Sequence, residues 1–192
     1  MVLPSNLCVL VPSDNLTLTD KTSYRARAVR RALDRALSLK IITGEAGAMV
    51  RHAQPILDFS VPVAVAVDSW LTAALTAVGT DFSCFQGNPA PTLAANKVAV
   101  FYNVTVETIP PPVSLLTFRL GGATGNVIGQ FWLESLYVMQ NLEGYFSEPQ
   151  VIDPTQPFAA QVRCRILTNT AARVALGCYI VEPAGQTIRV QA

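Results

Sequence analysis

The chain has 192 residues, of which 51% are hydrophobic and only 14% are charged, and its formal net charge is +1. This length suits one domain, or one domain with an elaborated end, and the charged fraction lies well below the roughly 25% of an average soluble domain. No run of apolar residues approaches the roughly 20 that span a bilayer, and no basic region precedes the apolar start. The sequence therefore predicts neither a transmembrane segment nor a signal peptide. Such an apolar composition indicates that part of the protein surface is buried against other subunits.

A basic segment lies early in the chain. Residues 21–40 hold half of the fourteen Lys and Arg side chains but a single acidic one, Asp34. Either Asp20 or Thr22 can cap a helix here, and the helix is predicted to run to about Thr43, before two glycines that can end it. We therefore expect a basic helix ahead of the remaining elements.

The predicted helix has two faces. Its apolar face is a rough stripe of Tyr24, Val29, Leu33, Ala36 and Leu37. Arginines recur every four residues on a second face, which is compatible with a solvated surface, with docking on an acidic neighbouring subunit, or with contact to nucleic acid or an anionic membrane. Without interleaved aromatic residues, a nucleic-acid contact would be made through phosphates. The predicted contact residues are Arg25, Arg27, Arg30, Arg31, Arg35 and Lys40.

The segment after the helix has mixed signals. Residues 49–52 can extend the helix, whereas valines alternate with small residues over 57–67 and predict a strand. Asp68 and Ser69 can cap a short inserted helix over 68–78, which has apolar residues at helical spacing. A loop is then predicted over 79–96, fixed to the core by its two phenylalanines.

From Lys97 onward the pattern is that of continuous β-structure. Strands are predicted at 98–106, 113–120, 127–139, 145–152 and 187–190, and residues 156–183 are predicted to form a hairpin. With the strand at 57–67, about eight strands separated by turn residues predict an antiparallel β-sandwich of jelly-roll type.

The hairpin predicted at 156–183 has the clearest alternation. Apolar residues at 158, 160, 162, 164 and 166 share one face of the first strand, and those at 174, 176, 178 and 180 share one face of the second. Asn169 supplies a residue for a left-handed turn position between them. Cys164 and Cys178 lie on these inward faces, where we expect free buried thiols in preference to a disulfide.

The residues that support catalysis or metal binding are sparse. His52 is the single histidine, no serine lies in a nucleophile turn, and the four cysteines lack metal-ligand spacing. The glycines at 121–129 lack the lysine of a phosphate-binding loop, and Trp70, Trp132 and Tyr137 can form either a binding platform or core. We therefore predict no enzyme, catalytic residue, metal, cofactor or small-molecule substrate.

Two segments follow from this reading: an arm and basic helix over 1–56, and a sandwich over 57–192, with 97 as an alternative start. This order of basic segment and strands, the turn at 153–156 and the ending at 179–183 resemble the single-jelly-roll capsid proteins of tailless icosahedral viruses, of the internal-membrane bacteriophage type. The resemblance implies a virion shell subunit, made in the host cytoplasm, whose partners are copies of itself and other virion proteins. Nucleic acid or membrane would contact residues 21–40. The alternative is a β-sandwich receptor- or carbohydrate-binding module of a phage tail or adhesion assembly.

Overall fold

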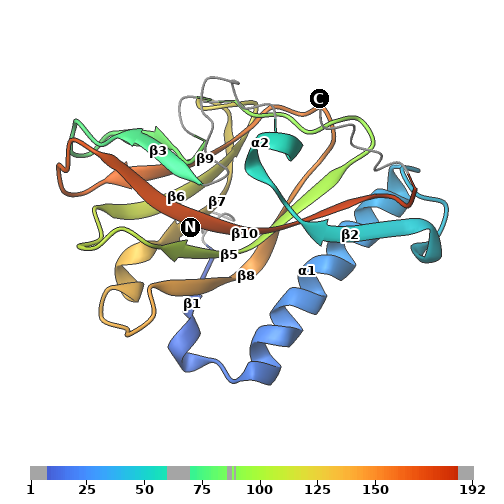
Figure 1. Cartoon of the computed structure of the whole chain (residues 1–192), viewed down its shortest axis with the longest axis horizontal. Helices are drawn as coiled ribbons and strands as arrows, with labels where there is room; N and C mark the ends of the chain where they lie inside the picture. Colours follow the sequence, from blue (N-terminus) through green and yellow to red (C-terminus); the bar gives the residue numbers. More distant parts are fainter. Residues whose placement is uncertain (1–7, 60–69, 86–87, 89, 186–192) are drawn as a thin grey trace, which may run out of the picture.

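The computed structural model describes residues 8–59, 70–85, 88 and 90–185, and it shows a mainly β protein with one long helix (Figure 1). The helices are α1 (Leu18–Ser38) and α2 (Pro55–Asp58), and short 3-10 turns lie at Ser13–Asn15, Glu45–Gly47 and Leu133–Leu136. The strands are β1 (Leu10–Pro12), β2 (Ala48–His52), β3 (Leu71–Ala74), β4 (Asp81–Ser83), β5 (Val98–Val106), β6 (Val113–Leu120), β7 (Asn126–Trp132), β8 (Glu143–Ile152), β9 (Phe158–Cys164) and β10 (Ala171–Pro183).

Strands β3 to β10 pair as a single long hairpin folded over on itself. The innermost pair is β6 with β7, and β5 with β8, β4 with β9 and β3 with β10 follow outward, all antiparallel. The folded hairpin forms two sheets, because β10 also pairs with β5 and β9 with β6. This nested order, β3-β10-β5-β8 facing β4-β9-β6-β7, is a jelly roll. The prediction of an antiparallel β-sandwich is confirmed.

Two further strands widen the first sheet. Strand β1 pairs with β8 at one edge, and β2 pairs with the far half of β10 at the other. Residues 10–12 belong to the predicted N-terminal arm and give the sheet an additional edge strand. Residues 49–52, by contrast, are strand and do not extend the helix as predicted, since β10 supplies their backbone partners.

The main core lies between the two sheets and is built around aromatic rings. The inward faces predicted for β9 and β10 are confirmed at residues 158, 160, 162 and 164 and at residues 174, 176, 178 and 180, which all line this core. The prediction was wrong for Ile166, which lies beyond the end of β9 and is exposed. The four cysteines are free thiols. Fully buried phenylalanines from six different segments meet here: Phe59, Phe101, Phe118, Phe131, Phe146 and Phe158.

The hairpin predicted at 156–183 is wrong in its pairing. Strands β9 and β10 lie in opposite sheets, and residues 165–170 cross from one sheet to the other. Asn169 does adopt the predicted left-handed conformation, with φ of 53°. Alternation shows that each strand has one buried face, but it does not identify the strand beside it, and each of these strands finds partners from distant parts of the chain.

The predicted inserted helix is also wrong. Residues 71–74 form strand β3, and Asp68 and Ser69 lie outside the described residues. Four residues beside β10 gain ladder hydrogen bonds that a short isolated helix could not replace. Of the strand predicted at 57–67, residues 57 and 58 are helical, Phe59 forms an isolated bridge to Leu93, and residues 60–67 lie outside the described residues.

Strand β5 is buried on both faces. Its first half places Val98, Val100 and Tyr102 on the outer face of the sheet, under α1, whereas Val104 and Val106 lie in the main core. The pairing of β5 with β8 is irregular between Phe101 and Asn103, so the alternation shifts by one residue there. The five residues that alternate in the sequence therefore do not share one face.

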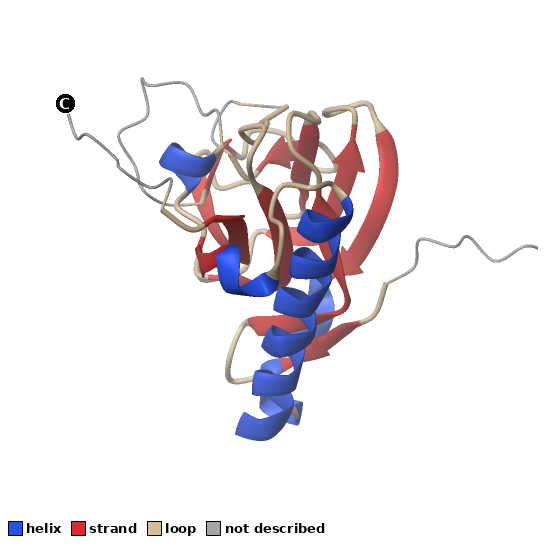
Figure 2. Cartoon of the chain, turned by 90° about the vertical axis from the view of Figure 1, so that its right-hand side faces the viewer, coloured by secondary structure: helices blue, strands red, loops and turns tan. Residues whose placement is uncertain are grey.

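Helix α1 forms a third layer against the outer face of the first sheet (Figure 2). Thr17 caps it and exchanges two hydrogen bonds with Asp20, which forms a capping box, so the cap lies three residues before Asp20, the earlier of the two predicted caps. It ends at Ser38, short of Thr43, with Lys40 in the left-handed region at φ 58°.

The buried stripe of α1 differs from the predicted one. Ala28, Ala32 and Ala36 have no exposed surface and lie directly on the sheet, while Tyr24, Leu33 and Leu37 are only partly buried beside them. Small side chains at positions four apart bring the helix backbone close to the strands. The predicted stripe identified the flanks of the contact and missed two of the three residues at its centre.

This packing predicts an asymmetric response to added bulk on α1. Ala32→Leu should lower the free energy of unfolding by about 1–3 kcal/mol, because its side chain has no space against the sheet. Ala26→Leu, on the exposed side of the same helix, should change it by less than about 0.5 kcal/mol. Urea denaturation measures both, and equal effects would contradict close packing of α1.

Candidate functional site

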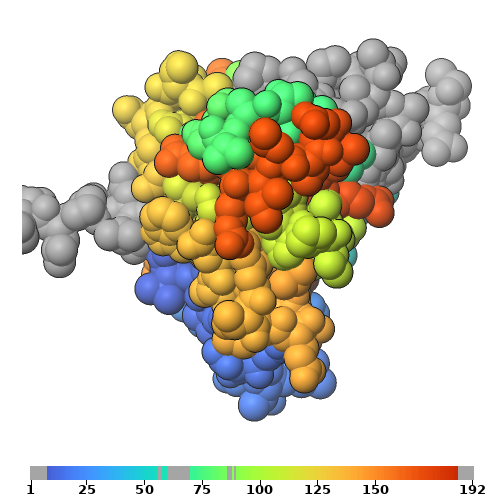
Figure 3. All heavy atoms as spheres, turned by 90° about the vertical axis from the view of Figure 1, so that its left-hand side faces the viewer, coloured from blue at the N-terminus to red at the C-terminus, as the bar shows by residue number. Residues whose placement is uncertain are grey.

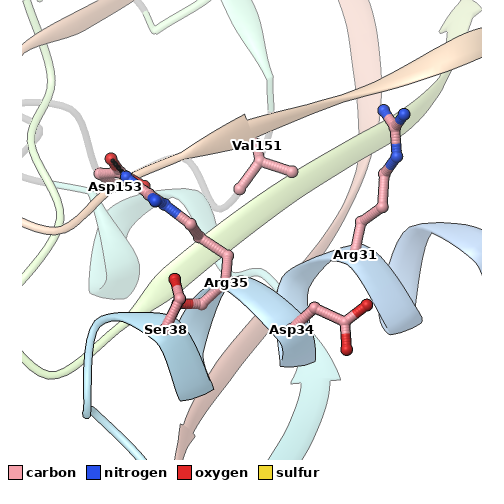
Figure 4. Close-up of a pocket in the computed structure, with 6 residues that line it drawn as sticks. All are labelled: Arg31, Asp34, Arg35, Ser38, Val151 and Asp153. Carbon is pink, nitrogen blue, oxygen red and sulfur yellow. Dashed lines mark hydrogen bonds and ion pairs between the residues drawn. The ribbon is translucent and has the colours of Figure 1, made fainter.

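The arginines predicted to contact an anion bind the protein's own sheet. Arg27 Nη2 donates to the carbonyl of Ser147 at 2.6 Å, and Arg31 Nη1 lies 2.6 Å from Glu148 Oε2. Arg35 donates to both carboxylate oxygens of Asp153, at 2.7 and 2.5 Å. Figure 4 shows Arg31 and Arg35 extending from α1 toward β8. This row of arginines clamps the helix along β8 and the residue that follows it.

The other predicted contact residues are placed differently. Arg25 Nη2 donates to the hydroxyl of Tyr145 at 3.2 Å. Arg30 lies 3.2 Å from Asp34 and 2.5 Å from Glu45. Lys40 is exposed and makes no salt bridge within the part of the chain that the structure describes. Five of the six residues are therefore engaged by groups of the same chain, and the structure brings the six together only in part.

The acidic partners of this helix come from far along the chain. Glu148 and Asp153 lie about 118 residues beyond the arginines that they bind, so the sequence offers no local sign of them. The hypothesis of docking on an acidic sandwich foresaw the right kind of surface, which proves to belong to the same subunit. Exposed ion pairs of this type contribute under about 1 kcal/mol each, so a polyanion at low salt could still compete for the arginines.

Glu143 is the centre of a second polar connection beneath α1. Its carboxylate accepts hydrogen bonds from Ser13 Oγ at 2.8 Å and from Asn103 Nδ2 at 2.7 Å. Burial, together with Glu143, raises the pKa of Tyr145, although Arg25 opposes the shift. A Cβ at Gly177 would overlap the Asn103 amide, so glycine is required opposite this network. The network joins the N-terminal arm, the helix and two central strands.

A buried cluster of four charges ties α2 to the open edge of the first sheet. The Asp58 carboxylate, which is fully buried, lies 2.5 Å from Arg51 and 2.8 Å from Lys97, and Glu182 lies 2.7 Å from Arg51. Burial alone would raise the pKa of Asp58, but hydrogen bonds from Arg51, the Gln54 backbone and Lys97 outweigh it and hold this pKa at about 2. Glu182 likewise has a lowered pKa, since the hydrogen bond and charge of Arg51 outweigh its burial. The ion pairs of this cluster hold α2 against strands β2 and β10.

Four connections of the jelly roll meet at one end of the sandwich, here called the loop end (residues 75–80, 107–112, 133–142 and 165–170). Backbone hydrogen bonds join them, from Leu75 to Thr170, from Gly79 to Cys164 and from Arg165 to Pro112. Figure 3 faces this end and shows the four connections side by side. A groove of about 380 Å³ lies between two of them, lined by residues 105–107, 109 and 140–143.

The remaining candidate residues are separated. His52 is exposed at the end of β2, with its ring centroid 4.6 Å from that of Tyr179. Trp70 packs in the core against Phe59 and Phe85, while Trp132 is exposed, so the tentative aromatic platform does not form. Across residues 8–59, 70–85, 88 and 90–185, no three His, Cys, Asp or Glu side chains are grouped to hold a metal, and no helix is long and apolar enough to cross a membrane.

Comparison with known proteins gives no relatives: the chain matches no protein-family model, no curated protein and no solved structure.

The buried cluster predicts how stability depends on pH. Because the pKa of Asp58 falls from 3.8 to about 2 on folding, its stabilising contribution is complete above about pH 4 and is lost as the pH falls through 2. Asp58→Asn should cost about 2–3 kcal/mol at pH 7, since it removes one of the two carboxylates that face Arg51 and Lys97.

The measurement is urea denaturation of wild type and Asp58→Asn between pH 7 and pH 2. The two curves should converge at the acidic end, whereas Asp34→Asn, on an exposed carboxylate, should follow wild type throughout. Wild-type and Asp58→Asn curves that stay parallel down to pH 2 would show that Asp58 does not titrate in this way.

The arginine row predicts a weak, salt-sensitive coupling. A double-mutant cycle of Arg35→Ala and Asp153→Ala should give a coupling energy below about 1 kcal/mol at low salt, because both groups are partly exposed. The coupling should shrink further in about 1 M salt, where the Debye length is about 3 Å. A coupling that is large and indifferent to salt would mean that this pair is shielded from solvent.

Proposed function

We propose that this protein is a structural subunit of a virion shell that assembles with copies of itself and with other virion proteins. The observation that carries the proposal is the nested pairing of β3 to β10, which forms a jelly roll from eight consecutive strands. Viral capsid proteins are among the main users of this architecture. Because a fold alone does not fix a function, the surface must also suit assembly.

The surface supports assembly in two ways. Large hydrophobic side chains remain exposed at ten described positions, among them Ile109 at 80% and Val138 at 84%, and contacts between subunits would bury such residues. The N-terminal layer is held on the sandwich by the arginine row and by Glu143. In a shell, the subunit would therefore behave as one rigid body that includes α1.

In this proposal, the basic helix is first a structural clamp and only second a surface for nucleic acid or anionic lipid. The cations nearest to solvent are Lys40, which makes no salt bridge within the described residues, and Arg30, which is 61% exposed but would have to exchange its pairs with Asp34 and Glu45 for such a contact. Jelly rolls also occur in lectins, and the exposed Trp132 suits stacking on a sugar. A receptor- or carbohydrate-binding module is therefore the second candidate.

The proposal predicts self-assembly of the purified full-length protein. Light scattering and analytical ultracentrifugation should show oligomers that grow with protein concentration. DNA and anionic vesicles should bind weakly at low salt, and Arg30→Gln/Lys40→Gln should weaken that binding without altering assembly. A protein that stays a small oligomer at every concentration and salt, and that binds glycans through Trp132, would be the second candidate instead.

A further inference from the structure

Among the residues that the structure describes, the exposed apolar side chains are concentrated at the loop end. Of the ten large hydrophobic residues exposed in the described part, five lie in the four connections of the loop end, at least one in each. A sixth, Trp132, ends strand β7 directly before one of these connections. The described residues of the opposite end, within 84–97, 121–125 and 153–157, contribute none of the ten. The six, with their exposed fractions, are Val78 (60%), Ile109 (80%), Trp132 (55%), Val138 (84%), Ile166 (41%) and Leu167 (51%).

Such a concentration differs from the scattered apolar residues of an ordinary surface. Single exposed hydrophobic side chains need no explanation. Six large ones, each about half exposed or more, present roughly 400–600 Å² of apolar surface, which is at the upper limit for a monomer. With a surrounding polar rim, this area approaches the roughly 800 Å² per partner of a specific interface.

Hydrogen bonds within the chain hold the connections that carry these residues, without any contribution from a partner. The backbone N–H groups of Arg165 and Ile166 both donate to the carbonyl of Pro112, at 2.7 and 3.1 Å. The Tyr137 hydroxyl donates to the carbonyl of Val113, and Leu75 N–H donates to Thr170. Because the loops are already ordered, a partner that buries them loses little conformational entropy.

The charges among the apolar residues indicate the kind of partner. Arg165 lies 3.8 Å from Glu134, and Arg173 lies 3.6 Å from Glu107, so the two exposed pairs sum to no net charge. A polyanion or an anionic lipid surface gains no net attraction from this rim. A second copy presents the same acidic and basic groups in reach of their opposites, which makes the rim complementary to itself.

We propose that copies of this chain contact one another through the loop end, with the six apolar residues at the centre of the interface and the two ion pairs at its rim. The proposal rests on the shell function proposed above and names its contact surface. Because the patch occupies one end of an elongated sandwich, copies that share it gather with these ends together around a symmetry axis.

The test compares Ile109→Asp/Val138→Asp with a matched control. Both side chains are almost fully exposed, so the double variant should fold. A thermal melting curve of the variant that matches the curve of wild type would verify this. Val9→Asp/Leu18→Asp places the same two charges on residues that are also exposed, 64% and 79%, away from the loop end. Sedimentation across protein concentration should show association of the loop-end variant weakened at least tenfold, with Val9→Asp/Leu18→Asp unchanged.

The outcomes separate the two proposals. If wild type and the loop-end variant assemble equally, the shell function stands and the loop end is not its contact. If wild type does not associate at all, both proposals fail. Binding of wild type to vesicles of neutral and anionic phospholipid, lost in the loop-end variant and without self-association, would overturn the contact between copies and assign this end to a membrane.

Discussion

The fold depends on the closure of β3 onto β10. These two strands lie about a hundred residues apart in the sequence, yet they form the outermost rung of the nested hairpin. Each inner pair has a fixed register, because a shift of one residue would turn apolar side chains away from the core. Contacts of such long range cost chain entropy before they return any stabilisation. The aromatic core, with its six buried phenylalanines, supplies the apolar burial that opposes this cost.

The first fifty residues use this finished sandwich as a base. Helix α1 lies on the outer face of one sheet through three alanines, and the arginines beside that stripe reach β8. A bulkier stripe would hold the helix too far away for the shorter hydrogen bonds. Small residues and long cations are thus complementary parts of one contact: the alanines set the distance, and the arginines set the position along the strand.

The sequence was a good guide to which residues are buried and a poor one to which strands are neighbours. Alternation placed β6, β9 and β10 correctly because each has one face in the core. It failed for β3, whose four residues owe their conformation to β10, and for β5, where an irregularity exchanges the faces. The arginines were visible as a cluster, but their partners Glu148 and Asp153 were not, because that pairing exists only once α1 and β8 are side by side.

The position of strand β10 in the chain has a consequence for when the sheet can form during synthesis. It is the last strand of the jelly roll, and it pairs with β2, β3 and β5, while the crossing that precedes it completes the loop end. During synthesis, residues 171–183 must therefore leave the ribosome before the first sheet can close. Until then the first sheet lacks the strand that joins β2, β3 and β5. The second sheet, by contrast, has all four of its strands once β9 has been made.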